Sequence, residues 1–318
     1  MKKTETKKNV VVIGGGHGQA TILKGLKQLA DIDLTAIVTV ADDGGSTGRL
    51  RRRFHIPAMG DIRNVMIALA KSETLLSSLM DYRFSASEEK ELDGHNLGNL
   101  MLSALSEKTG SFMEAILQIS SVLNVMGTII PSTLEVVTLM AAMSDGVIVS
   151  GESNIPIYQN RVQRVFYNHE VKATRDAIRA VEAADVIILG IGSLYTSILP
   201  NLIIEDLRKA LVACKAKKYY MCNVMTQSGE TDHYSVEDHV DALIKHLGGD
   251  IDSVIVANDP LPPEILVRYE AEHATPVLIR DKHHDYQLKK VSLLTFENQL
   301  IRHDPNKIKR LFARLLKE

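Results

Sequence analysis

The chain has 318 residues, of which 45% are hydrophobic and 24% are charged, and its formal net charge is −2. This composition excludes a mostly disordered protein and fits a globular chain with a large core. The balanced charge gives no sign of a nucleic-acid partner, and no apolar run reaches the roughly 18 to 20 residues of a membrane span. Two cysteines without metal or redox spacing, and a polar start without a signal peptide, predict a cytoplasmic protein without membrane insertion.

A strand, a helix and a second strand are expected first, over residues 9–13, 19–29 and 34–40. Both strands are continuous apolar runs, which is typical of parallel strands that are buried on both faces. The start of the chain therefore predicts a βαβ unit.

The first strand breaks into a glycine-rich turn that contains Gly14, Gly15, Gly16, His17 and Gly18. Without Cβ atoms, such a turn can aim the N–H groups of the following helix at an anion. The dinucleotide fingerprint is incomplete because Gln19 occupies its third glycine position, and no Gly-Lys-Ser/Thr sequence follows. We interpret the turn as an anion site that implies neither NAD nor a P-loop, although glycines after a strand also serve simply to turn the chain.

A second turn follows the next strand and contains Asp42, Asp43, Gly44, Gly45 and Ser46. The two carboxylates suit sugar hydroxyls or a hydrated magnesium ion, and they suit helix capping or turn chemistry equally well. Five arginines follow this turn: Arg49, Arg51, Arg52, Arg53 and Arg63. Their positive charge would attract a phosphorylated ligand or would merely form a solvated face.

The pattern then becomes helical, with helices expected over residues 61–71, 73–82, 97–106 and 111–123. We predict a mostly helical subdomain at about 61–123, inserted beside the sheet. Residues 145–168 predict two antiparallel strands around a turn, added to an edge of the same sheet.

Buried strands return at 185–190, 218–224 and 253–258, with helices at 201–214 and 236–247. Alternation of strands and helices predicts an α/β protein with a doubly wound, mostly parallel sheet covered by helices on both faces. With no repeat and no long linker, we expect a single domain over residues 9–318.

A third loop of the same kind contains Gly190, Gly192 and Ser193 and leads into a helix. Asn223 falls near the end of the next predicted strand, where a ligand contact and a turn or capping role are equally expected. Loops at the carboxyl edge of a doubly wound sheet form its usual ligand site. A polar cluster at 230–239 is interpreted as a surface loop before a helix capped by Ser235, and His283 and His284 are given no chemistry.

Seven motifs in order resemble the YvcK family, the gluconeogenesis factors, which lie within a wider group with the CofD-like phospholactate transferases. They occupy residues 11–18, 35–51, 60–70, 94–100, 151–156, 190–202 and 222–235, and a looser match covers 300–307. The resemblance implies a Rossmann-like cytoplasmic protein that binds UDP-sugars such as UDP-N-acetylglucosamine. It also implies support of cell shape and envelope synthesis during growth on gluconeogenic carbon sources, without an established reaction.

The resemblance also adds ligand positions at Asn64, Asn201 and Arg302. His17 stands where the family usually has threonine, and Ile191 where it usually has proline. A histidine is bulkier than threonine and, when neutral, donates through one ring nitrogen only, so ligand choice depends on this position.

The leading hypothesis is a regulatory protein that binds a nucleotide sugar, with the diphosphate at residues 14–18 and hydroxyl or base contacts from Asp42, Asp43, Ser46 and Asn201. The alternative is a CofD-like, magnesium-dependent transferase of a phospholactyl-type group, with Asp42 and Asp43 on the metal and no evident general base. A scaffolding protein without a small ligand is the third possibility, and a homo-oligomer is compatible with the sequence.

Overall fold

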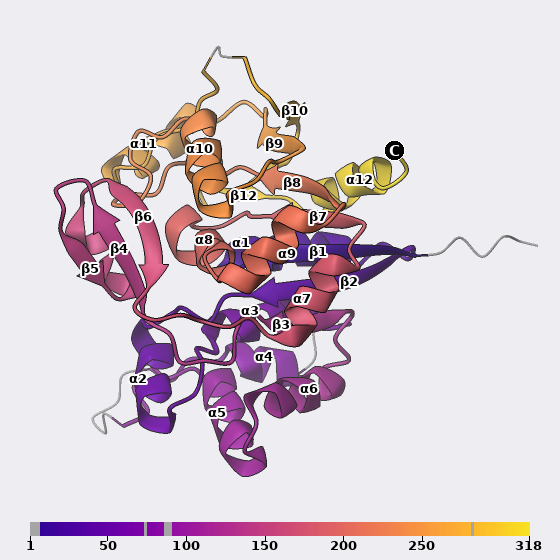
Figure 1. The fold of residues 1–318 in the computed structure, drawn as a ribbon, viewed down its shortest axis with the longest axis vertical. Helices are drawn as coiled ribbons and strands as arrows, with labels where there is room; N and C mark the ends of the chain where they lie inside the picture. The colour runs from indigo at the N-terminus through magenta and orange to yellow at the C-terminus, as the bar shows by residue number, and fades with distance from the viewer. Residues whose placement is uncertain (1–6, 73–74, 86–90, 281–282) are drawn as a thin grey trace, which may run out of the picture.

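Seven parallel strands form the central sheet within the described residues of the computed structural model, which are 7–72, 75–85, 91–280 and 283–318. The strands are Lys8–Gly14 (β1), Ile32–Val38 (β2), Thr128–Pro131 (β3), Val186–Leu189 (β7), Lys217–Met221 (β8), Ser253–Ala257 (β9) and Gln287–Val291 (β10). Their order is β10, β9, β8, β7, β1, β2, β3 (Figure 1). The chain winds outward from β1 to β3 and then returns to the other side of β1 as β7, so the topological switch point lies between β1 and β7.

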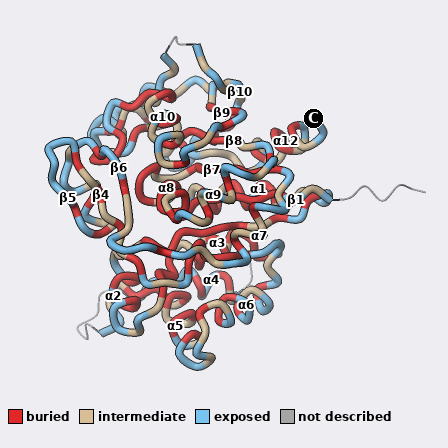
Figure 2. Tube along the Cα trace, viewed as in Figure 1, coloured by how far each residue is buried: buried red, intermediate tan, exposed pale blue. Residues whose placement is uncertain are grey.

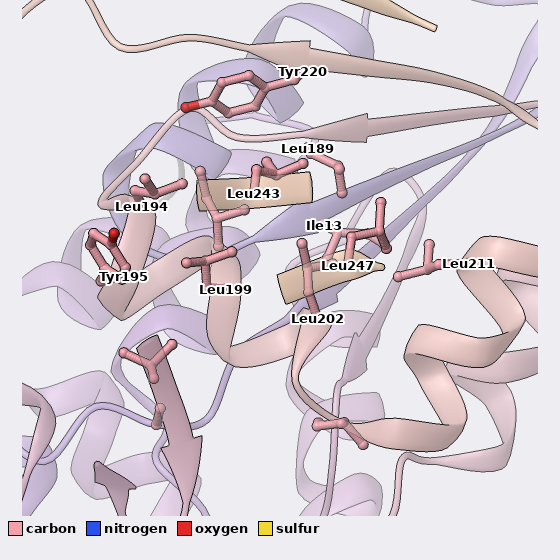
Figure 3. Close-up of a cluster of buried hydrophobic side chains, with 14 of the residues drawn as sticks. Ile13, Leu189, Leu194, Tyr195, Leu199, Leu202, Leu211, Tyr220, Leu243 and Leu247 are labelled. Carbon is pink, nitrogen blue, oxygen red and sulfur yellow. The ribbon is translucent and has the colours of Figure 1, made fainter. Parts of the chain in front are cut away.

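Side chains of β1 alternate between two hydrophobic cores, one on each face of the sheet. Val10 and Val12 belong to the core formed with α1 (Gly16–Leu26), α3 (Gly60–Leu69) and α12 (Pro305–Leu315). Val11 and Ile13 belong to the opposite core, with α7 (Arg175–Glu182), α9 (Glu205–Ala213) and α10 (Val236–Leu247), and part of this core is drawn in Figure 3. Figure 2 shows buried backbone running through the sheet and the helix faces that cover it. Burial on both faces explains the continuous apolar strands, and the predicted Rossmann-like α/β fold is confirmed.

The segment between β2 and β3 is helical, as predicted, and begins earlier than expected. It comprises α2 (Gly45–Phe54), α3, α4 (Leu75–Asp81), α5 (Leu97–Thr109) and α6 (Phe112–Val122). The first two residues of the helix expected at 73–82 lie outside the described residues. Helix α5 begins at the cap Asn96, whose side chain accepts from the N–H of Asn99, and α6 begins at the cap Ser111.

The antiparallel strands expected at 145–168 are present, but the prediction that they extend an edge of the main sheet was wrong. They are β5 (Ile148–Ser150) and β6 (Val162–Tyr167), and both pair with β4 (Leu139–Met143) in a separate three-stranded sheet. The apolar run at 134–143 contains β4, which serves as the central strand for both β5 and β6, so these two strands do not pair with β3 at the edge of the main sheet. In Figure 1 this small sheet lies beyond the carboxyl ends of β1 and β7.

The remaining elements flank these sheets. They are a π-helical turn Leu194–Ile198, α8 (Leu199–Leu202), α11 (Pro263–Ala271) and the hairpin β11 (Leu294–Glu297) with β12 (Leu300–His303). In the part of the chain that the structure describes, no helix has the length and apolarity needed to cross a bilayer. The single domain over 9–318 stays a prediction.

Candidate functional site

Loops at the carboxyl ends of β1, β2, β7 and β8 touch one another. Thr39 N–H donates to the Gly14 carbonyl at 2.9 Å, which joins the first two loops. A side-chain carbon placed on Gly18 would lie 2.5 Å from the carbonyl carbon of Ile191, so the start of α1 packs directly on the third loop. The Asn223 side chain donates to the Gly192 carbonyl at 2.8 Å and accepts from its N–H at 3.2 Å. The loops at the strand ends are therefore adjacent, as predicted, and Asn223 joins the loop after β8 to the loop after β7 through two hydrogen bonds.

A cavity of about 470 Å³ opens beside this junction, and several elements contribute to it. Its lining includes the predicted residues His17, Gly18, Asn223 and Arg302, of which Arg302 comes from β12, near the end of the chain. The sequence analysis did not single out three further lining residues, Lys24, Tyr269 and His303. This volume suits a ligand of nucleotide size, and Lys24 and Arg302 supply positive charge to its wall.

His17 lies in a positive environment at the start of α1. Burial lowers the pKa of His17, and the charges of Arg63, Arg302 and Lys24 lower it further, against the opposite effect of Asp81. Helix α1 has no acidic residue in its own first turn, and its N-cap residue Gly15 makes no side-chain hydrogen bond, although Asp61 of α3 accepts from the Gly16 N–H. The cationic side chains favour an anionic ligand in the cavity, and the N–H groups of α1 that Asp61 does not engage add to this preference.

The position of Gln19, which breaks the dinucleotide fingerprint, has a structural role. Its fully buried amide nitrogen donates to the carbonyls of Val12 at 3.0 Å and Ile37 at 2.8 Å, so it ties β1 to β2. The third glycine of that fingerprint serves close packing of helix and strand, and here a hydrogen-bonded side chain occupies the place.

Four carboxylates gather around the second loop, and only one of them was predicted. Burial is the main cause that raises the pKa of Asp61 to about 7, of Glu230 to about 7 and of Glu152 to about 8. The pKa of Asp42 is also raised, chiefly by burial. A hydrogen bond from the Gly16 N–H opposes the shift at Asp61, so one amide expected to face a diphosphate already has a carboxylate partner. The three carboxylates that were not predicted, Asp61, Glu152 and Glu230, lie within the motifs at 60–70, 151–156 and 222–235. Their place in these motifs was the sequence signal that could have identified them.

The pair Asp42 and Asp43 serves the local fold. Asp43 accepts from the N–H of Ser153 at 3.0 Å and of Glu152 at 3.1 Å, and Asp42 accepts from the N–H of Gly44 at 2.9 Å. Gly45, with φ 43°, is the first residue of α2. The turn role that the sequence left open is thus present at Asp42, whereas α2 itself has no side-chain cap. Among the described residues there is no group of three or more His, Cys, Asp or Glu side chains set to hold a metal, and each oxygen of Asp43 already accepts one backbone N–H.

Ser46 faces the helical segment. It is 3% exposed, and its Oγ contacts Nδ1 of His95 at 3.1 Å and accepts from the N–H of Asn96 at 3.2 Å. Thus Ser46 fixes the start of α2 against the start of α5.

Three other predicted residues support the loops from within. Asn201 is fully buried and donates to the Gly14 carbonyl at 3.2 Å, so it holds the first loop from behind. Ser193 caps the turn that precedes α8 and donates to Glu230. Asn64 accepts from Arg63 at 2.7 Å. Direct ligand contact from these side chains stays a prediction.

Two predicted surface features are in fact buried. Arg51 is 6% exposed and donates to the carbonyls of Asp42 at 3.0 Å and of Val137, so it closes the second loop instead of forming a solvated face. Glu230, expected in a surface loop, is 2% exposed. The predicted cap is confirmed, because Ser235 and Asp238 form a capping box at the start of α10.

Comparison with known proteins places this site in a family context. The family model of CofD, 2-phospho-L-lactate transferase, matches residues 10–300. The gluconeogenesis factor of Bacillus subtilis is 46% identical, covering 98% of this chain and 99% of that protein. A putative gluconeogenesis factor of Aquifex aeolicus is 41% identical, over 98% and 97%. A crystal structure from Bacillus halodurans, described as a member of the upf0052 family, has a TM-score of 0.92 and 41% identity, over 97% and 99%.

Proposed function

This chain belongs to the CofD family and, within it, to the gluconeogenesis factors, and from that premise we propose that it binds a nucleotide sugar of the UDP-N-acetylglucosamine type. In this proposal it acts as a cytoplasmic regulatory protein that supports cell shape and envelope synthesis during gluconeogenic growth. The names of its relatives support the link with gluconeogenesis.

The observation that carries the proposal is the cavity of about 470 Å³ at the switch point between β1 and β7. Ligands of doubly wound sheets bind in this crevice, outside the carboxyl ends of the strands. The cavity combines two exposed cations, Lys24 and Arg302, with the start of α1, which together suit a diphosphate.

Two further lining residues suit the less charged parts of such a ligand. Tyr269 offers an aromatic ring, and its hydroxyl accepts from the Ile301 N–H at 3.0 Å, so it also fixes the hairpin that carries Arg302. Asn223 lies at the same cavity with its amide already bonded to Gly192. A ring held in place beside a phosphate site is suited to a nucleobase or a sugar face.

Isothermal titration calorimetry with UDP-N-acetylglucosamine tests the proposal, with and without magnesium. We expect saturable 1:1 binding that needs no metal and that weakens strongly in Arg302→Ala. The matched control is Arg310→Ala, an exposed arginine of α12 outside the cavity lining. Absence of binding at millimolar ligand, or equal binding by both variants, would exclude this function.

Transfer of a phosphorus-containing group is the second candidate. The match to the CofD model favours it, and so does the set of half-buried or buried carboxylates Asp42, Asp61, Glu152 and Glu230. Desolvation raises the pKa of each, and the values of about 7 to 8 for Asp61, Glu230 and Glu152 let these groups exchange protons near neutral pH. Binding of GDP or a deazaflavin with turnover, in the absence of UDP-sugar binding, would support this candidate instead.

A further inference from the structure

We propose that His17 is a proton-coupled contact of the ligand: it is neutral in the free protein, takes up a proton when a phosphate enters the cavity, and so makes binding tighten as the pH falls. The inference rests on the proposed function and adds a specificity-determining residue to it.

The position of His17 is fixed by its neighbours. It is the second residue of α1, and its carbonyl accepts from the Thr21 hydroxyl at 2.9 Å. The next residue, Gly18, is in close contact with Ile191 and cannot shift without moving the third loop. The imidazole is exposed at the cavity and has no hydrogen-bond partner within the described part of the chain. It is therefore free to bond to a ligand.

The charges that face His17 come from four elements. Arg63 of α3, Arg302 of β12 and Lys24 of α1 are cations, and Asp81 at the end of α4 is the one anion among the groups that shift it. His303, the other histidine of the cavity lining, has its pKa lowered to about 4 by burial and stays neutral near neutral pH.

A bound phosphate reverses this balance. Three cations and partial burial hold the pKa of His17 below its usual value, so the ring is neutral at pH 7. An anion placed among the same cations offsets their repulsion and attracts a proton to the ring. An opposite charge within bonding distance raises a histidine pKa by about 1 to 3 units, which shifts it toward the physiological range. Binding and protonation then strengthen each other.

Other groups near the site also titrate near neutral pH, so the experiment must separate them. Asp61 and Glu230 have pKa values of about 7 and lie at the neighbouring loops. The measurable quantity is thus the difference in proton uptake between the natural protein and His17→Asn, which keeps a polar donor but does not titrate. The control for a general histidine effect is His55→Asn, at an exposed left-handed position that asparagine also adopts.

Calorimetry with UDP-N-acetylglucosamine at pH 6, 7 and 8, in buffers of different ionisation enthalpy, gives affinity and proton uptake together. The diphosphate of this ligand does not titrate in that range. We expect the Kd of the natural protein and of His55→Asn to fall about 3- to 10-fold more between pH 8 and pH 6 than the Kd of His17→Asn, whose remaining pH dependence reports the other titrating groups. Equal pH slopes and equal proton uptake in all three proteins would overturn the inference.

A second measurement separates this inference from the proposed function. The titration of the His17 ring is followed by NMR with and without sulfate, an anion that does not titrate in this range. The inference predicts that sulfate raises the His17 midpoint by about one unit, and an unchanged midpoint contradicts it. If UDP-N-acetylglucosamine does not bind but sulfate shifts His17, the ligand identity is wrong while the proton-coupled anion contact stands.

Discussion

Replacing Gly18 with alanine should separate the first and third loops, because no room exists for one more carbon between them. The new Cβ would lie 2.5 Å from the carbonyl carbon of Ile191 and 2.8 Å from the amide nitrogen of Gly192, where ordinary contact begins at 3.4 Å. These neighbours are backbone atoms, and the carbonyl oxygen of Ile191 would lie nearer still, so the third loop must move by more than the difference between 3.4 and 2.5 Å, about 0.9 Å. Overpacking of this kind costs about 1–3 kcal/mol, and the better helix propensity of alanine offsets at most about 1 kcal/mol.

We expect Gly18→Ala to lower Tm by about 2–6 °C in a thermal scan. Because the third loop and Asn223 move with Gly192, calorimetry should also show binding of UDP-N-acetylglucosamine weakened at least about tenfold, or about 1.4 kcal/mol. The matched control is Gly14→Ala, whose new carbon would lie 3.5 Å from Cβ of Gln19, an ordinary contact. The reasoning is refuted if the two variants melt and bind alike.

Four further outcomes test the site and the fold. Gly16→Val should abolish ligand binding in a folded protein, as judged by calorimetry and circular dichroism. The φ of 61° strains a β-branched residue and so distorts the turn, while a Cβ makes only ordinary contacts with Asp61 at 3.8 Å and Ser197 at 3.9 Å; unchanged affinity contradicts this. Arg302→Ala should raise the Kd for UDP-N-acetylglucosamine about 10- to 100-fold in the same assay, since it removes a charge-assisted hydrogen bond, and a change below about 2-fold would exclude a phosphate contact. The pKa of Glu152 is raised to about 8, above its unfolded value, so ionisation of Glu152 destabilises the fold as pH rises from about 4.5 to 8. Glu152→Gln should therefore raise Tm on the order of 5 °C at pH 8.5 and leave Tm unchanged at pH 4. The opposite trend would be inconsistent with burial as the cause of the pKa shift. The pKa of Asp259 is lowered to about 2 by hydrogen bonds whose effect outweighs that of burial, so the stability that its charge contributes is present above about pH 4 and is lost as pH falls toward 2. Asp259→Asn should therefore lower Tm by about 2–8 °C at pH 7 and by less at pH 2. An equal loss of Tm at both pH values would rule out a role of its charge.

The sequence by itself indicated the parallel, doubly wound character of the sheet, its strands β1, β2, β7, β8 and β9, and the edge at which we propose the ligand site. Strands such as β1 and β7 are buried on both faces, so their apolar runs are continuous and easily read, and each ends in glycines that mark the carboxyl edge. The cap of α10 could also be predicted from the sequence, because Ser235 and Asp238 are three residues apart and form a capping box through local hydrogen bonds alone.

Only the tertiary structure decided which side chains meet at that edge. Arg302 and Tyr269 reach His17 from parts of the chain more than 250 residues away, and Glu230 becomes buried because Ser193 and Thr196 of another loop cover it. The pairing of β5 and β6 with β4, in place of the main sheet, likewise depends on contacts distant in sequence. Periodicity and capping report interactions within about one helical turn or one strand, whereas burial and charge at the site are set by neighbours that no local pattern identifies.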